Sequence, residues 1–327
     1  MRLVVNGVQR ITVRDELSCR DLQDMKITRP EIRVTADPVL GLEQRFVDDE
    51  AGRKILEQAG VNLSKEKKLI GVSPREWQGL SEYKQVLAAL CDKLSRVGFQ
   101  VVFLPMHYPD DLKTSQEIVS LMEQPATVLT GNYSVADTAA LIANMDLLVG
   151  MRLHALILAA VMGVPPVAIS YDPKIDRFMN LLGREAAINV AEPDFDCLWE
   201  DVQTIICDPW VAREELVQEV EPLRQRARES AVMALQVLDS TCVVIERRLP
   251  IFNALWRETM KKKSWLPILC LCLSLLWSLP AWAANQVAPG VRQCPFKRPT
   301  GKVSLSRSCP GGRSKAAIYR DTSHYGQ

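Results

Sequence analysis

The sequence has few histidines and few aromatic residues, and its charges nearly cancel. Three of the 327 residues are histidine, aromatic residues make up 6%, and the formal net charge is +1 at pH 7. The chain therefore lacks the basic excess that is typical of general nucleic-acid binders. Its nine cysteines are scattered, and none of the first five forms a CxxC pair or a cluster with histidine. This spacing argues against a metal site and fits a reducing cytoplasm.

Apolar residues, in contrast, are plentiful. They make up 47% of the chain, which is enough to build the core of two domains or of one large domain. Helix-like and strand-like segments alternate through residues 1–207, and residues 211–259 have a helical pattern. The short runs 101–104 and 147–149 are apolar on both faces, as parallel strands covered by helices should be. The alternation predicts an α/β fold with a doubly wound, Rossmann-like sheet and right-handed crossovers, followed by helices.

The predicted elements have the following bounds. Strands are expected at residues 11–14, 32–35, 69–73, 100–104, 126–129, 147–150 and 166–169. Helices are expected at residues 16–25, 50–59, 82–97, 111–122, 135–143, 152–162 and 176–182.

Residues 260–283 have the layout of a secretory signal peptide inside the chain. A methionine and three lysines precede an apolar stretch that ends in Ala281-Trp282-Ala283. One interpretation is a membrane anchor, because about 20 apolar residues can span a bilayer. A second is a core helix, which Pro267 and Pro280 disfavour. We favour a third, the start of a neighbouring reading frame fused to this one, because residues 285–327 are basic, lack a helix or strand pattern and are predicted to be disordered.

Charged groups follow the ends of five predicted strands. In a doubly wound sheet the ligand lies beyond the carboxyl ends of the strands. The most informative group is Arg152-Leu153-His154, which opens an apolar helix whose first free N–H groups can bind an anion. Because guanidinium groups pair bidentately with phosphate and carboxylate, these groups predict a site for a small, multiply charged anion. The other four are Arg14-Asp15, Asp37-Pro38, Ser73-Pro74-Arg75 and Tyr171-Asp172-Pro173-Lys174.

Each of these residues also has a purely structural interpretation. Arg152 and His154 are two residues apart, so a regular helix would splay them, and both reach one ligand only if the junction is not yet helical. His107 follows another strand end and is a second candidate histidine, with a turn role as its alternative. The remaining alternatives are a helix cap for Arg14-Asp15, a turn for Asp37-Pro38, a surface pair of Arg75 with Glu76, a solvated Lys174 and a core position for His154.

Five short segments occur in the order and spacing of a known family. They are Ile11-Thr-Val-Arg-Asp-Glu-Leu-Ser18, Val34-Thr-Ala-Asp-Pro38, Gly71-Val-Ser-Pro-Arg75, Gly150-Met-Arg-Leu-His-Ala155 and Gly163-Val-Pro-Pro-Val-Ala-Ile-Ser-Tyr-Asp-Pro-Lys174. With these segments the chain resembles the polysaccharide pyruvyl transferases, in particular the bacterial cell-wall branch associated with S-layer anchoring. The resemblance runs from residue 1 to about residue 250. It implies a fold like that of B-type glycosyltransferases, in which two Rossmann-like halves face a cleft.

The resemblance implies an activity and a set of site residues. Members transfer the pyruvyl unit of phosphoenolpyruvate to two hydroxyls of a sugar, forming a ketal and releasing phosphate. The implied acceptor is a cell-wall polysaccharide or a lipid-linked oligosaccharide, and no resident cofactor is implied. The implied location is the cytoplasm, with the inner face of the membrane as an alternative.

The Arg-x-His motif of the family falls on Arg152 and His154, which are implied to bind phosphoenolpyruvate. An earlier arginine is also implied, with Arg14 as first choice and Arg75 as second, and Leu153 and Lys174 complete the predicted substrate-binding residues. Since imidazole changes charge near working pH, we expect His154 to be the general acid that protonates C3. We expect Asp172, or alternatively Asp37, to take the proton of the sugar hydroxyl.

The chain departs from the family at its beginning. Members carry an N-terminal half with a glycine-rich loop before the Val-Arg-Asp segment, which here begins at Val13. We therefore expect that roughly 100 residues are absent and that the chain is the C-terminal part of such an enzyme. The rival functions are a nucleotide-sugar glycosyltransferase or epimerase of similar fold, and an inactive membrane-attached fragment. The predicted organisation begins with residues 1–30, a remnant of the N-terminal half or an interdomain segment, and continues with a Rossmann-like pyruvyl transferase domain at 31–208. C-terminal helices follow at 209–259, then a signal-peptide-like or membrane segment at 260–284 and a basic, disordered tail at 285–327.

Overall fold

The computed structural model describes residues 2–64 and 67–261. The chain divides into two compact units, one of residues 12–22 and 32–231 and one drawing on residues 1–11, 23–31 and 232 onward. The segments predicted for residues 260–284 and 285–327 lie, apart from residues 260 and 261, outside the described residues. Among the described residues, no helix is long and apolar enough to cross a bilayer.

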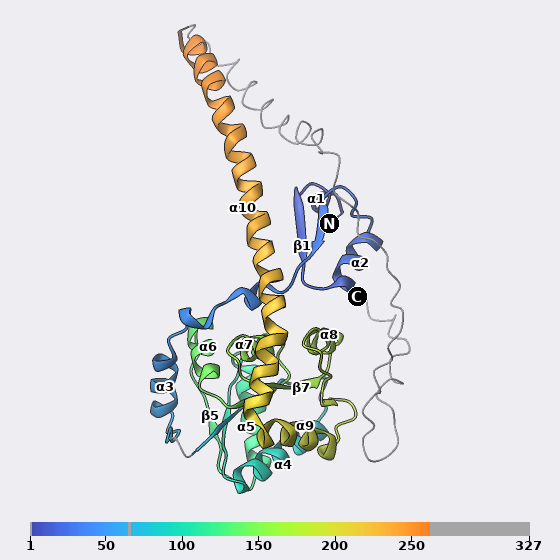
Figure 1. Cartoon of the computed structure of the whole chain (residues 1–327), viewed down its shortest axis with the longest axis vertical. Helices are drawn as coiled ribbons and strands as arrows, with labels where there is room; N and C mark the ends of the chain where they lie inside the picture. Colours follow the sequence, from blue (N-terminus) through green and yellow to red (C-terminus); the bar gives the residue numbers. More distant parts are fainter. Residues whose placement is uncertain (1, 65–66, 262–327) are drawn as a thin grey trace. The chain divides into compact units, whose positions relative to one another are not determined.

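A six-stranded parallel sheet forms the centre of the larger unit (Figure 1). Its strand order is β5-β4-β3-β6-β7-β8. In the central pair, Ile70 of β3 lies opposite Leu147 of β6, and Ser73 lies opposite Gly150. The strands are β3 (Leu69–Ser73), β4 (Gln100–Phe103), β5 (Thr127–Val128), β6 (Leu147–Gly150), β7 (Pro166–Ser170) and β8 (Ile188–Asn189). The predicted α/β class with a doubly wound sheet is confirmed.

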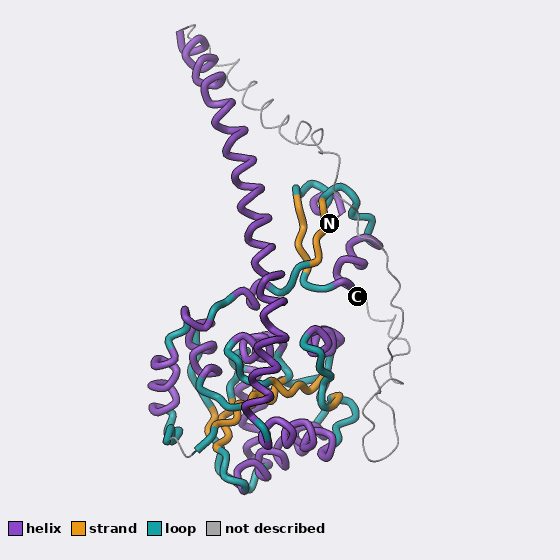
Figure 2. The backbone as a smooth tube through the Cα atoms, viewed as in Figure 1, coloured by secondary structure: helices purple, strands orange, loops and turns teal. Residues whose placement is uncertain are grey.

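Helices cover both faces of this sheet, which explains why its central strands are buried along their whole length. Figure 2 shows the strands between two layers of helices. Every residue of β3, β6 and β7 is buried. One layer contains α4 (Glu82–Arg96), α5 (Asp110–Leu121) and α9 (Phe195–Cys207). The other contains α6 (Val135–Ala143), α7 (Leu153–Val161) and α8 (Pro173–Leu181).

Side-chain caps fix where several helices begin. Ser134 and Asp137 form a capping box at α6, in which the Ser134 hydroxyl oxygen accepts a hydrogen bond from the Asp137 N–H at 3.1 Å. Asp172 caps α8 by accepting the Lys174 N–H at 2.9 Å, and Pro173 occupies the first helical position. The sequence prediction started α8 at residue 176, three residues late, because it did not use the Asp-Pro cap.

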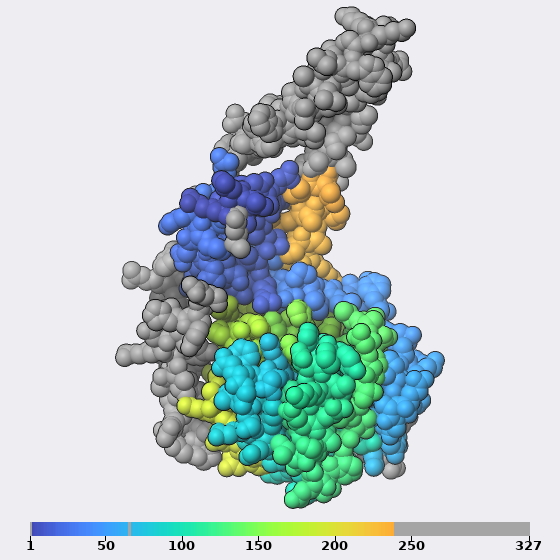
Figure 3. Space-filling view, turned by 180° about the vertical axis from the view of Figure 1, so that it is seen from behind, coloured from blue at the N-terminus to red at the C-terminus, as the bar shows by residue number. Residues whose placement is uncertain are grey.

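Helix α3 (Asp49–Gln58) packs closely against α6, and Figure 3 shows the two side by side. The close approach depends on Gly52, where an added Cβ would lie 2.2 Å from the carbonyl oxygen of Ala140. The Asn144 side chain ties the two helices further by donating to the carbonyl of Asp49 at 2.9 Å.

Shorter elements and one long helix complete the described chain. They are α1 (Arg2–Val5), β1 (Arg10–Val13), α2 (Glu16–Asp24), β2 (Glu31–Val34), the 3-10 helices η1 (Pro38–Gly41) and η2 (Gln44–Phe46), and α10 (Pro209–Lys261). β1 and β2 form a two-stranded sheet. Within the larger unit, α10 is anchored by Arg226, which donates to the Thr35 carbonyl at 2.6 Å, and by an Arg213–Asp146 ion pair at 3.3 Å.

Candidate functional site

Three of the predicted cations follow strands near the point where the strand order of the sheet reverses. After β3 the chain continues to β4 and β5 on one side, and then returns to β6, β7 and β8 on the other. The loops that follow β3 and β6 therefore diverge, which in open α/β sheets creates the ligand-binding crevice. Arg75 follows β3, Arg152 follows β6, and Lys174 follows β7.

Arg152 is held by a buried carboxylate that the sequence analysis did not predict. Its Nε lies 2.8 Å from Oδ2 of Asp111, and its Nη2 lies 2.5 Å from Oδ1. Asp111 is fully buried, and its Oδ2 also accepts the backbone N–H groups of Met106 and His107 at 3.2 and 2.9 Å. The arginine is thus fixed by a two-point contact with α5.

His154 is the exposed residue of an otherwise buried helix. Every other residue of α7, from Leu153 to Val161, is buried. The imidazole makes no hydrogen bond or ion pair with any part of the chain that the structure describes. Arg152 has extended backbone angles, φ −77° and ψ 120°, so the helix begins one residue later than predicted. The junction is therefore not yet helical at Arg152, as the shared-ligand interpretation requires.

Arg75 joins the loops after β3 and β7. Its Nη1 donates to the Tyr171 hydroxyl at 2.6 Å, and its guanidinium carbon lies 4.8 Å from the Tyr171 ring centre and 5.3 Å from that of Trp77. Lys174 lies over the same tyrosine at 5.0 Å and pairs with Asp172 at 3.3 Å. Since β6 lies between β3 and β7, this contact joins the loops on both sides of the Arg152 strand.

The four predicted cations differ in how their charges are balanced. Arg152, Arg14 and Lys174 each pair with a carboxylate, from Asp111, Asp37 and Asp172 respectively. Arg75 has a neutral phenol as its partner, and no carboxylate of the described residues lies within ion-pair distance of it. Arg75 therefore contributes an uncompensated positive charge at this edge of the sheet.

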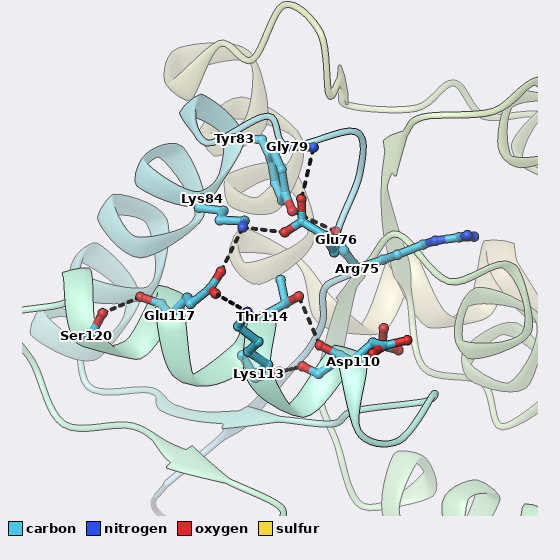
Figure 4. A network of polar contacts seen from close by, with 12 residues as sticks. Arg75, Glu76, Gly79, Tyr83, Lys84, Asp110, Lys113, Thr114, Glu117 and Ser120 are labelled. Carbon is cyan, nitrogen blue, oxygen red and sulfur yellow. Dashed lines mark hydrogen bonds and ion pairs between the residues drawn. The ribbon is translucent and has the colours of Figure 1, made fainter.

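Helix α4 fixes the loop that carries Arg75 (Figure 4). The buried Tyr83 hydroxyl donates to the Arg75 carbonyl at 2.7 Å. The Lys84 ammonium binds Glu76 at 2.5 Å and Glu117 at 2.8 Å. Burial lowers the pKa of Lys84, but its hydrogen bonds to these two glutamates outweigh that effect, so its pKa is raised. The side chain of Arg75 points away from this network, which leaves the guanidinium available to the β7 loop.

Arg14 lines a pocket together with Leu153. Arg14 Nη1 is 3.3 Å from Asp37 Oδ2, and Arg177 Nη1 is 3.9 Å from Asp15 Oδ1. Burial raises the pKa of Asp15, but hydrogen bonds from Ser18 and the charges of the two arginines outweigh it and lower the pKa. The pocket is lined by Arg14, Asp15, Asp37, Leu40, Leu153, Ile157, Arg177, Phe178 and Leu181. The structure thus groups Arg14 with Leu153, and Arg75 with Lys174.

Asp37 and Asp172 both act as caps. Asp37 Oδ1 accepts the Val39 N–H at 3.2 Å at the start of η1, which agrees with the turn interpretation of Asp37-Pro38. Asp172 caps α8 through the Lys174 N–H.

A third acid near β7, Asp176, was not predicted as a site residue. Its carboxylate accepts a hydrogen bond from the Ser170 hydroxyl at 2.8 Å, and burial raises its pKa. In the described ranges no three His, Cys, Asp or Glu side chains are grouped so that they could hold a metal ion.

Solved structures similar to this chain are similar in fold. The S. aureus MnaA–UDP co-structure has a TM-score of 0.50 and 10% identity, over 68% of this chain and 59% of that one. The glycosyl transferase family 9 structure from Veillonella parvula DSM 2008 has a TM-score of 0.37 and 20% identity, over 55% of this chain and 53% of that one. This chain therefore spans less than two thirds of the length of these relatives.

The sequence itself matches a protein family. A search of curated proteins finds no significant match. The family described as polysaccharide pyruvyl transferase, however, matches residues 1–173, which is more than half of the chain. The matched region contains the Arg75 and Arg152-Leu153-His154 segments and ends one residue before Lys174. The chain therefore belongs to the polysaccharide pyruvyl transferase family.

Proposed function

We propose that the edge of the sheet beyond β3, β6 and β7 binds phosphoenolpyruvate, and that the enzyme transfers its pyruvyl unit to a sugar of a bacterial cell-wall polysaccharide. The observation that supports this most is the placement of Arg75, Arg152 and His154 at the switch point between β3 and β6. S-layer anchoring is our proposal for the role of the product. The cytoplasm, or the inner face of the membrane, is our proposal for the location.

The donor substrate fits the charges of this edge. Phosphoenolpyruvate carries a phosphate and a carboxylate, and both are ligands that a guanidinium group binds with paired hydrogen bonds. Arg75 supplies the uncompensated positive charge, and Arg152 supplies donors that are not used by Asp111. The free N–H groups at the start of α7 add a further attraction for an anion.

The proposed reaction needs one proton donor and no cofactor. His154 gives a proton to C3 of phosphoenolpyruvate, C2 becomes electrophilic, and a sugar hydroxyl oxygen bonds to C2 while its proton passes to Asp172 or Asp37. The bond from C2 to the phosphate oxygen then breaks, phosphate leaves, and the oxygen of a second hydroxyl takes its place on C2 while the proton of that hydroxyl returns to His154. The products are the pyruvate ketal and phosphate. Arg75 and Arg152 stabilise the charge on the leaving phosphate.

Replacing His154 tests the proposed acid. His154→Ala should lower phosphate release from phosphoenolpyruvate, measured with a cell-wall oligosaccharide acceptor, by roughly 10²–10⁴-fold, the usual contribution of a general acid. Its melting temperature should stay that of the wild type, because the imidazole is exposed and has no partner in the described chain. His107→Ala is the matched control, since His107 is also exposed. Near-normal turnover of His154→Ala would refute the acid role.

Two rival functions are separated by the same assay. A nucleotide-sugar glycosyltransferase or epimerase would hydrolyse or convert a UDP-sugar and leave phosphoenolpyruvate intact. An inactive fragment would turn over neither substrate, even when an N-terminal half from a relative is supplied. Release of phosphate from phosphoenolpyruvate, together with a ketal on the sugar, is expected only of a pyruvyl transferase.

A further inference from the structure

We infer that Asp111 is a positioning residue of the anion site: it holds Arg152 by the Nε–Nη2 edge of the guanidinium group and so presents the Nη1–Nη2 end to the ligand. The identity of the ligand rests on the proposed function, whereas the orientation of Arg152 does not. The inference follows from the contacts of one buried carboxylate.

Asp111 uses both of its oxygens for this task. One oxygen accepts the Arg152 Nη2 group, and the other accepts the Arg152 Nε group together with the N–H groups of Met106 and His107. The carboxylate is 0% exposed, whereas the arginine side chain is 21% exposed. A buried carboxylate is costly unless it is paired and hydrogen-bonded, so these contacts determine where the guanidinium group sits.

The same contacts determine which N–H donors of Arg152 remain free to bind a ligand. A guanidinium group has five N–H donors in one plane, and Asp111 takes one from Nε and one from Nη2. Nη1 has no hydrogen-bond partner within residues 2–64 and 67–261. The remaining donors of Nη1 and Nη2 point along the end of the group, where they form a fork that fits two oxygens of a phosphate or carboxylate.

A role in charge alone and a role in positioning predict opposite changes in anion affinity when Asp111 is replaced, and this makes the inference testable. Asp111 is negative, so its removal raises the positive potential at the site and would strengthen anion binding if only charge mattered. If Asp111 positions Arg152, its removal leaves the guanidinium group free to rotate, and anion binding weakens. Asp111→Asn separates the two effects because it removes the charge and half of the two-point contact with little change in shape.

The experiment measures the binding of phosphoenolpyruvate to the full chain by titration calorimetry. Asp111→Asn and Arg152→Lys should each weaken binding by about 10- to 100-fold, the effect expected when a binding group is misplaced by about 1 Å. The double variant should bind no more weakly than Arg152→Lys alone, because lysine cannot form the fork that Asp111 orients. In the transfer assay, Asp111→Asn should raise KM for phosphoenolpyruvate more than it lowers kcat.

Asp92→Asn is the matched control. Asp92 is also a buried carboxylate, 6% exposed, and it accepts the N–H groups of Glu123 and Gln124. It binds no arginine among the described residues. Asp92→Asn should lower the melting temperature and leave the affinity for phosphoenolpyruvate unchanged. Equal losses of affinity in Asp92→Asn and Asp111→Asn would overturn the inference, because a general loss of packing would then explain both.

A measurement without ligand separates this inference from the proposed function. In the wild type, the ¹H–¹⁵N signal of Arg152 Nε should exchange slowly with water, because Asp111 accepts that proton; in Asp111→Asn it should exchange fast. A fast signal in the wild type would overturn the inference even if Asp111→Asn fails to fold. If the wild type does not bind phosphoenolpyruvate but the Nε signal is slow, the proposed donor is wrong and the positioning of Arg152 stands.

Discussion

Tyr83→Phe should destabilise the larger unit and loosen the loop that carries Arg75. The substitution keeps the ring, which is 0% exposed, and removes the hydroxyl that donates to the Arg75 carbonyl at 2.7 Å. A buried hydrogen bond of this kind contributes about 1 kcal/mol, and the unpaired carbonyl raises the loss to about 1–2 kcal/mol. For a unit of this size the loss corresponds to a fall in melting temperature of roughly 2–8 °C. Because the Arg75 loop is less fixed, KM for phosphoenolpyruvate should rise.

The pH dependence of folding stability gives a second test of the role of Tyr83. Burial raises the pKa of the Tyr83 phenol above its ordinary value of 10.0. A raised pKa means that the folded state keeps its proton above pH 10.0 while the unfolded state loses it, so the stability that this group contributes falls as pH rises beyond that value. The deficit of Tyr83→Phe relative to the wild type should therefore shrink in alkaline solution. Tyr108→Phe is the control, since Tyr108 is 52% exposed. A melting temperature of Tyr83→Phe equal to that of the wild type at pH 7 would refute the reasoning.

Two further substitutions test other parts of the fold. Burial raises the pKa of Asp176 above 3.8, so between that value and the folded pKa the folded state binds more protons than the unfolded state. The wild type should therefore lose stability as pH rises through this window. Asp176→Asn should remove this loss. Urea unfolding at pH 4 and pH 7 measures this slope, and an unchanged slope in the variant would contradict the assignment. Gly52→Ala should destabilise by about 1–3 kcal/mol, because its Cβ would lie 2.2 Å from the Ala140 carbonyl oxygen and force α3 away from α6. A wild-type urea midpoint for Gly52→Ala would show that the two helices can separate without loss.

The sequence patterns located the centre of the sheet better than its edges. The bounds of β3, α6 and β6 agree with the predictions, and those of the two strands do so because continuous apolar runs mark buried strands. The edge strand β8 has two residues, Ile188 and Asn189, which is too short for a hydrophobic period to show. Helix α9 was not predicted, although Asp194 caps it and buried apolar residues recur along it. Helix α9 could therefore have been predicted from the sequence, whereas β8 could not.

Only part of the site was predicted from the sequence, and the reason is physical. Strand ends are local in sequence, so Arg75, Arg152 and Lys174 were found from the residues that precede them. The residues that pair with these cations are distant in sequence. Asp111 lies 41 residues from Arg152, in a helix whose acidic residues have the sequence pattern of ordinary surface charges. The separation of Arg14 from Arg75 likewise depends on tertiary packing. The role of each predicted site residue stays a prediction until the variants are measured.

The strand order also has a consequence for when the site forms during folding. β3 pairs with β4 through one short crossover, but its pairing with β6 brings together segments that are separated by 77 residues, as in the contact of Leu69 with Asp146. Such distant pairings form late, because the chain pays the entropy of closing the loop before the contact stabilises it. The two loops of the switch point therefore meet only when both halves of the sheet have docked. An anion that binds there recognises the completed sheet, so it should slow global unfolding.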